Sequence, residues 1–205
     1  LVNLLPIGGR LLDFSARAYF VDAISILRPD ADHVVISEVN YELDEYFSIY
    51  GENAFDFCLN MEVLEHLSFD PAHMVWSINR MLKPGGLLFL STPNALAMAN
   101  ALHWMQGDSP TLWNQVIPGQ PYFERHNRDW TPSEVVRILE EHGFGVLEVC
   151  AFDFYETTRE LLRQHSTLAS YLRRHASHAY FGDTLCVLAR KLESVAAPIR
   201  NPWLY

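Results

Sequence analysis

The chain has 205 residues, of which 49% are hydrophobic and 20% charged, proportions that are typical of a soluble globular domain. Its formal net charge is −10 at pH 7. Because phosphate groups are bound mainly by Lys and Arg, this acidic balance argues against a nucleic acid or an anionic membrane as a partner. No apolar run reaches the roughly 18 residues of a membrane-spanning helix. We expect one domain over residues 1–205, with its core at about 10–190 and a C-terminal arm at 191–205.

The three cysteines, Cys58, Cys150 and Cys186, are far apart in the sequence and lie in apolar runs. We interpret them as buried free thiols in a reducing compartment, and therefore expect a cytoplasmic protein. No Cys-x-x-Cys pair or Cys/His ligand spacing is present, so no metal site is assigned. The chain begins at Leu1 rather than at a methionine, so whether a segment precedes it stays open.

In the first part of the chain, short apolar runs alternate with one helical pattern. Residues 39–53 are acidic and aromatic without a clear period, and a further short strand is one interpretation of them. The elements expected here are a strand at Leu11–Asp13, a helix at Ala18–Leu27 and a strand at His33–Ser37 with Glu38 at its tip.

From residue 55 onward the patterns are clearer. Thr131, Pro132 and Glu134 together indicate a helix start, with a capping box and a proline at the first helical position. Gly143 marks the end of that helix. The other elements expected are strands at Phe55–Leu59, Leu87–Ser91, Val146–Ala151 and Thr184–Ala189, helices at Pro71–Leu82, about 95–105 and Glu156–His175, and a sharp turn at Pro84–Gly86.

This alternation of strands and helices predicts an α/β fold with a largely parallel sheet. The run FDFCLNMEVLEHL at 55–67, followed by a helix, the turn LKPGG and the strand LLFLSTPN, resembles the class I S-adenosylmethionine-dependent methyltransferases of the small-molecule type. The resemblance spans about residues 10–190. It implies a doubly wound, mostly parallel, seven-strand Rossmann-like sheet with an antiparallel last strand, and S-adenosylmethionine as cofactor.

The resemblance also assigns cofactor-binding roles to particular residues. Ligands of open α/β sheets bind at the carboxyl ends of the strands. The family's loop D-x-G-x-G-x-G follows the first strand, an acid at the end of the second binds the ribose hydroxyls, and residues after the fourth face cofactor and substrate. The matching positions in this chain are Asp13, Ser15 and Arg17 in the loop, Glu38 as the ribose acid, and Asn60, Met61 and Glu62 after the fourth strand.

The loop departs from the family because Ser15, Arg17 and Tyr19 occupy its three glycine positions. Glycine permits a positive φ and a close approach of the backbone to the ligand. Two interpretations stay open: the loop binds the cofactor along another path, with Arg17 pairing its carboxylate, or the larger side chains fill the site. Only 17 residues separate Glu38 from Asp56, which is short for a complete parallel crossover.

Two histidines are candidates for catalysis. His66 follows the fourth strand and titrates near neutral pH, so it can act as a general base, although it can equally cap the turn. The segment PYFERHNRDWTPSEV supplies the second, His126, and with Tyr122 and Arg128 it is expected to bind the acceptor; a salt-bridged loop is the alternative. This segment faintly resembles family members that modify sugars or glycans.

The sequence thus favours a methyltransferase acting on a small-molecule acceptor, with a sugar or glycan hydroxyl as one option. The alternative is a catalytically silent, methyltransferase-like scaffold or partner subunit that has lost cofactor binding. Trp203 and Tyr205 in the tail indicate a docking contact, either in a homodimer or with a protein partner.

Overall fold

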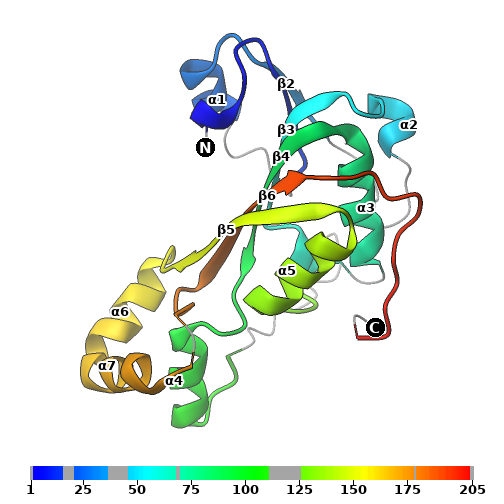
Figure 1. Cartoon of the computed structure of the whole chain (residues 1–205). Helices are drawn as coiled ribbons and strands as arrows, with labels where there is room; N and C mark the ends of the chain where they lie inside the picture. The colour runs from blue at the N-terminus through cyan, green and yellow to red at the C-terminus, as the bar shows by residue number, and fades with distance from the viewer. Residues whose placement is uncertain are drawn as a thin grey trace, which may run out of the picture.

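The computed structural model describes residues 2–15, 21–36, 46–67, 70–110, 126–177 and 179–203. Within these ranges six strands form one sheet in the order β2-β1-β3-β4-β6-β5 (Figure 1). Strands β2, β1, β3 and β4 are parallel to one another, and β6 is antiparallel to both β4 and β5. The strands are β1 (Arg10–Asp13), β2 (Asp32–Val35), β3 (Phe55–Met61), β4 (Leu82–Pro93), β5 (Phe144–Phe152) and β6 (Thr184–Lys191). The predicted α/β class and the antiparallel last strand are confirmed.

The helices lie on both faces of the sheet and beyond one of its ends. No helix within the described ranges is long and apolar enough to cross a membrane. Their bounds are η1 (Val2–Leu4), α1 (Val21–Leu27), α2 (Tyr46–Tyr50), η2 (Leu64–His66), α3 (Pro71–Met81), α4 (Met98–Gln106), α5 (Pro132–Glu141), α6 (Glu156–Gln164) and α7 (Ser166–His175).

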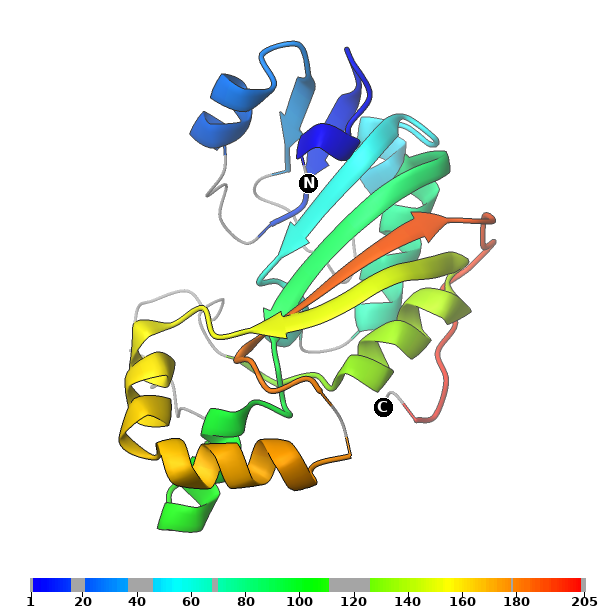
Figure 2. The same ribbon diagram turned by 60° about the vertical axis from the view of Figure 1, so that its left-hand side comes forward.

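The two faces of the sheet are covered unequally. Helices α3 and α5 pack on one face and enclose the main core, which includes Ile78, Leu88, Ile138 and Val187, all without solvent exposure (Figure 1). The other face carries α1, whose Ile24 packs with side chains of β1 and β3. Among the described helices, only the short α1 packs on this second face. Figure 2 shows α4, α6 and α7 together beyond one end of the sheet.

Local signals in the sequence set the ends of the main helices. The side chain of Asp70 accepts a hydrogen bond from the N–H of His73 at 3.1 Å and so caps α3. The predicted capping box of α5 is present, with Thr131 and Glu134 each bonding the other's backbone N–H. Gly143 has a φ of +78°, the left-handed conformation that favours glycine just after a helix.

Three expectations about the elements need correction. Within residues 39–53, where a short strand was one interpretation, 46–50 form the helix α2, and 39–45 lie outside the described residues. Tyr46 is wholly buried and stacks edge-on against Phe14, with ring centroids 5.1 Å apart. The turn at Pro84–Gly86 lies within β4 as a bulge, since the β3–β4 register shifts between Phe55 and Phe57.

The single helix expected at Glu156–His175 is interrupted at His165, whose φ and ψ are −111° and 31°. The interruption lets two separate apolar faces reach α4, because Leu162 of α6 and Ala169 of α7 both pack with Met98 and Leu102.

The described part of the C-terminal arm crosses the outer side of α3 and α5. Trp76 of α3 donates to the carbonyl of Val195 at 2.9 Å, and Arg200 pairs with Asp70, the cap of α3. Trp203, predicted as an exposed docking residue, lies partly buried under the guanidinium of Arg137, 4.4 Å from its ring centroid. The arm is therefore held by the helical layer, whereas Tyr205 lies outside the described residues.

His142 ties this arm to the end of α5. It is wholly buried; its Nδ1 lies 2.7 Å from the carbonyl of Ile138, and its Nε2 accepts from the N–H of Ile199 at 3.0 Å. Burial lowers the pKa of His142, so the folded chain keeps the ring neutral. Above the ordinary pKa of about 6.5 the ring is neutral in both states, and its contribution to stability is complete. Below that pH the unfolded chain binds a proton that the folded chain resists, so stability falls.

We expect His142→Ala to lower the free energy of unfolding by about 1–3 kcal/mol near pH 7, because the N–H of Ile199 loses its acceptor. This deficit relative to the wild type should shrink as the pH falls below about 6.5. Urea unfolding at several pH values measures it, with the exposed His175→Ala as the matched control. A deficit that stays constant down to pH 5 would contradict the conclusion that burial lowers the pKa of His142.

Candidate functional site

Polar side chains gather where β1, β3 and β4 end, at the edge that binds ligands in open α/β sheets. Of the residues predicted to bind the cofactor, the structure describes Asp13, Ser15, Asn60, Met61 and Glu62, and it places all of them at this edge. Arg17 and Glu38, and the predicted acceptor residue Tyr122, lie outside the described residues.

Hydrogen bonds join the ends of β1 and β3 tightly. The N–H of Phe14 donates to the carbonyl of Leu59 at 2.7 Å, and the amide of Asn60 donates to the carbonyl of Phe14 at 2.8 Å. The hydroxyl of Ser15 accepts from the N–H of Met61 at 3.2 Å. These bonds fix the spacing of the two strand ends on which the site is built.

Ser15 shows how the first glycine position tolerates a side chain. Among the described residues other than glycine, only Asn53 and Glu62 have a positive φ, so Ser15 needs no left-handed backbone. The side chain is buried, and its hydroxyl bonds β3 within the protein. The concern that this position requires glycine does not hold for Ser15.

Two acceptors at this edge lack donors. The carboxylate of Asp13 is 1% exposed, and neither oxygen has a hydrogen-bond partner among the described residues, although Nε2 of His33 lies 3.4 Å from Oδ2. The side-chain oxygen of Asn60 likewise has no partner there. Buried acceptors are normally satisfied in folded proteins. An acceptor without a donor can bond an N–H or O–H group of a ligand, such as an ammonium or a sugar hydroxyl, where that ligand reaches it.

Glu62 follows Met61 in an unusual conformation. Its φ is +54°, which costs a residue with a side chain roughly 1–2 kcal/mol, and its carboxylate accepts from the hydroxyl of Ser91 at 2.7 Å. Burial raises the pKa of this carboxyl. Strained backbone of this kind is often found at functional sites.

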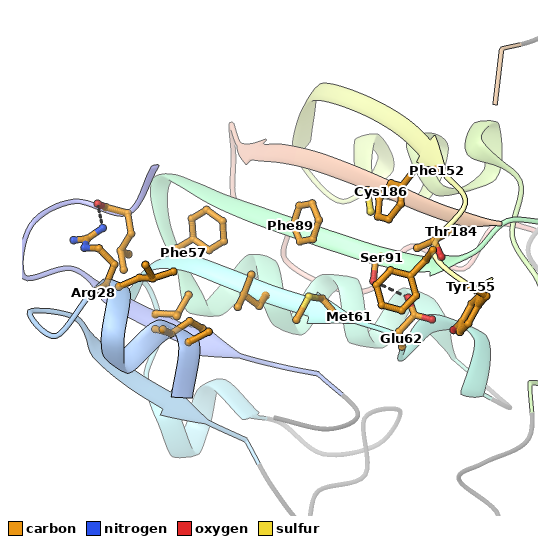
Figure 3. Close-up of a pocket in the computed structure, with 17 residues that line it drawn as sticks. Arg28, Phe57, Met61, Glu62, Phe89, Ser91, Phe152, Tyr155, Thr184 and Cys186 are labelled. Carbon is orange, nitrogen blue, oxygen red and sulfur yellow. Dashed lines mark hydrogen bonds between the residues drawn. The ribbon is translucent and has the colours of Figure 1, made fainter. Parts of the chain in front are cut away.

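A groove with a volume of about 570 Å³ runs along the face of the sheet that α1 leaves open. Its walls are almost entirely apolar, with Phe57 and Phe89 along its floor and Arg28 at one end (Figure 3). Glu62 and Tyr155 lie at the opposite end, beside the edge just described (Figure 3). The volume is in the usual range of small-molecule pockets.

The short helix η2 brings a second polar group to the same end of the sheet. Glu65 has no solvent exposure; its Oε2 accepts from the hydroxyl of Thr92 at 3.0 Å, and its Oε1 has no hydrogen-bond partner among the described residues. Nε2 of His66 lies 3.6 Å from that Oε1. One ligand atom from each of Glu65, His66 and His126 lies within 4.8 Å of the other two.

The segment that follows His126 is fixed onto η2 by its backbone. The N–H of Asn127 donates to the carbonyl of Glu65 at 2.7 Å, and the side chain of Asn127 donates to the carbonyl of His66 at 2.8 Å. The rings of His66 and His126 meet edge to face with centroids 5.0 Å apart. The two predicted catalytic histidines are therefore neighbours.

The surroundings of this cluster raise the pKa values of two of its groups, Glu65 and His126. Burial raises the pKa of the Glu65 carboxyl to about 7. The pKa of His126 is raised, mainly because its ring donates a hydrogen bond to the carboxylate of Asp129. The group can therefore hold and release a proton near pH 7, or hold a divalent cation through one carboxylate and two imidazoles. Glu65 was not predicted as a site residue, because the spacing of Glu65 and His126 along the chain gives no ligand signal.

Arg128 has partners of its own. Its guanidinium pairs with Glu134 and stacks over the ring of Trp130, 4.6 Å from the centroid. These contacts match the salt-bridged loop that was the alternative for this segment, and contact between Arg128 and an acceptor stays a prediction.

The chain matches the family model described as a methyltransferase domain over residues 6–149. Relatives include the ubiquinone biosynthesis O-methyltransferases of Colwellia psychrerythraea, 26% identical over 122 residues, and of Chromobacterium violaceum, 30% identical over 119 residues. Each alignment covers 58% of this chain but 47% and 49% of the relatives, so the chain spans about half the length of the curated relatives it matches.

The fold is also that of solved methyltransferases. A SAM-dependent methyltransferase from Archaeoglobus fulgidus superposes with a TM-score of 0.59 at 15% identity, covering 89% of this chain and 86% of that one. The partner of the Trm112 methyltransferase activator in a Haloferax volcanii complex superposes with a TM-score of 0.55 at 14% identity, covering 94% and 87%. The chain thus belongs to the class I S-adenosylmethionine-dependent methyltransferase family.

Proposed function

We propose that this chain transfers a methyl group from S-adenosylmethionine to a hydroxyl of a small molecule. The observation that carries the proposal is the sheet edge at the ends of β1 and β3, where buried acceptors on Asp13 and Asn60 have no donor among the described residues. The carboxylate–imidazole cluster of Glu65, His66 and His126 follows β3. The names of the ubiquinone biosynthesis relatives favour oxygen as the methyl acceptor.

When bound, S-adenosylmethionine would supply a methyl group on a positively charged sulfur, and that sulfur would be the leaving group of an in-line displacement. The chain's part is to bind and orient. Asp13 and Asn60 accept hydrogen bonds from cofactor N–H or O–H groups, and Glu38 is assigned to the ribose hydroxyls. Arg17 is assigned to the cofactor carboxylate. Holding the reacting groups in line can supply roughly 7–11 kcal/mol of the barrier reduction.

The cluster of Glu65, His66 and His126 takes up the proton that the acceptor hydroxyl loses in this proposal. We assign His66 as the base that removes it, with the carboxylate of Glu65, 3.6 Å away, stabilising the imidazolium that forms. His126 is placed to orient the acceptor or to exchange the proton with this pair. Tyr122 and Arg128 complete the proposed acceptor site, and a sugar hydroxyl is one acceptor that they suit.

A silent scaffold is the second candidate function. Arg17 and Tyr19 stand at glycine positions, and a solved methyltransferase fold of similar shape is the partner of an activator protein. In that case the edge would carry no cofactor, and the chain would act by binding a partner.

The first test is calorimetric titration of the chain with S-adenosylmethionine and S-adenosylhomocysteine. We expect micromolar binding that Glu38→Ala weakens about 10-fold or more, because charge-assisted bonds contribute roughly 1.5–3 kcal/mol each. Glu140→Ala, an exposed acid on α5, is the matched control and should leave the affinity unchanged. Absence of heat at high ligand concentration would favour the scaffold.

A second test separates the histidines. We expect His66→Gln to lower the rate of methyl transfer by about 10²–10⁴-fold with little change in cofactor affinity, because the base acts on the acceptor. His175→Gln, exposed on α7, is the control. Equal, small losses for His66→Gln and His126→Gln would remove both from the proton transfer.

The same cluster can act through a divalent cation instead, which the donor set of Glu65, His66 and His126 permits. In that case Mn²⁺ should bind the purified chain in a calorimetric titration, and His126→Ala should weaken that binding about 10-fold or more. Chelation by EDTA should then stop methyl transfer while cofactor binding persists. Full activity in EDTA would exclude the cation and support the role of the cluster in proton transfer.

A further inference from the structure

Two of the three cysteines meet across the sheet. Cys150 of β5 and Cys186 of β6 are direct partners in the antiparallel register. The expectation of a buried thiol holds for Cys186 but is wrong for Cys150, which is exposed, and the β5–β6 pairing brings the two opposite each other. Cys58 is the third, and it is wholly buried in the main core.

The two side chains lie on the same face of the sheet. Leu185 and Val187 on either side of Cys186 belong to the main core, so Cys186 faces the other way, where it lines the groove (Figure 3). Residues directly opposite in an antiparallel pair share a face. Phe152, two residues beyond Cys150, lines the same groove next to Cys186 (Figure 3).

The spacing of such partners suits a covalent bond. Directly opposite residues of an antiparallel pair have Cα atoms about 4.5 or 5.5 Å apart, depending on whether they exchange hydrogen bonds. A disulfide needs a Cα separation of about 4.4–6.8 Å. Either type of pair meets this requirement without movement of the strands. Cys58 lies on the opposite face, in the core beneath α3, and is out of reach.

We propose that Cys150 and Cys186 are a redox modification site that forms a reversible cross-strand disulfide when the chain meets a small-molecule disulfide. The proposal is independent of methyl transfer, since it rests on the register and on the exposure of Cys150 alone. A pair of this kind belongs to the labile, exposed class of disulfides rather than to structural ones.

The chemistry balances with such an oxidant. The thiolate of Cys150 attacks one sulfur of the small disulfide, forming a mixed disulfide and releasing one thiolate. Cys186, as thiolate, then attacks the sulfur of Cys150 and releases the second. Two protein thiols are oxidised, and the oxidant is reduced to two thiols, which take up the two protons that the protein thiols lose. Cys150 reacts first because it is exposed, whereas burial raises the pKa of Cys186 to about 12.

The bond would form beside the candidate active site. Cys186 is also the register partner of Ser91 on β4, and the hydroxyl of Ser91 donates to Glu62. Oxidation would remove the free thiol of Cys186 from the groove wall. The disulfide would link β5 to β6 covalently at the level of Ser91.

The test is incubation of the full chain with oxidised glutathione at mildly alkaline pH, then alkylation of remaining thiols, digestion and mass spectrometry. We expect the Cys150 and Cys186 peptides to be joined, Cys58 to be alkylated, and dithiothreitol to reverse the link. Cys150→Ser and Cys186→Ser should each abolish it, and Cys58→Ala is the matched control that should retain it.

Complete alkylation of both cysteines after oxidation would overturn the proposal. So would a link that involves Cys58, or one that joins separate chains and rises with protein concentration. The peptide map of the wild type distinguishes these outcomes by itself, so the test stands even where Cys58→Ala fails to fold.

Discussion

The buried carboxylate of Glu65 is the constraint around which the functional end of the molecule is arranged. A carboxyl group without solvent exposure needs donors or a counter-charge around it, and otherwise its pKa rises, as it does for Glu65. Thr92 of β4 supplies one donor, and the backbone of Asn127 anchors on the carbonyl of the same residue. η2, the end of β4 and the segment after His126 therefore meet at Glu65, and the two histidines are neighbours as a result.

The scaffold beneath this group is rigid because two further sets of contacts hold it. Asn60 and Ser15 join the ends of β1 and β3, so these two strand ends have a fixed spacing. On the outer side, Arg200 of the C-terminal arm pairs with Asp70, the cap of α3, which begins shortly after η2. A contact near the end of the chain thus supports the helix that follows the candidate site.

The unequal covering of the sheet explains where the remaining chemistry lies. Helices α3 and α5 bury one face completely, which leaves thiols such as Cys58 without access to reagents. The face under α1 stays open and forms the groove. Since β6 runs antiparallel between β4 and β5, it aligns Ser91, Cys186 and Cys150 in one row on that open face. The proposed disulfide therefore lies on the surface that forms the groove.

The sequence by itself determined the features that depend on local interactions. The alternation of apolar runs gave the α/β class, and Thr131 with Glu134 gave the start of α5, because periodicity and capping involve residues within a few positions of each other. Only the tertiary structure decided what depends on sheet register and long-range packing. It brought His126 to Glu65, paired Cys150 with Cys186, and turned the hydroxyl of Ser15 toward β3. No local pattern encodes these contacts, because their partners lie far apart in the chain and meet only when the strands align.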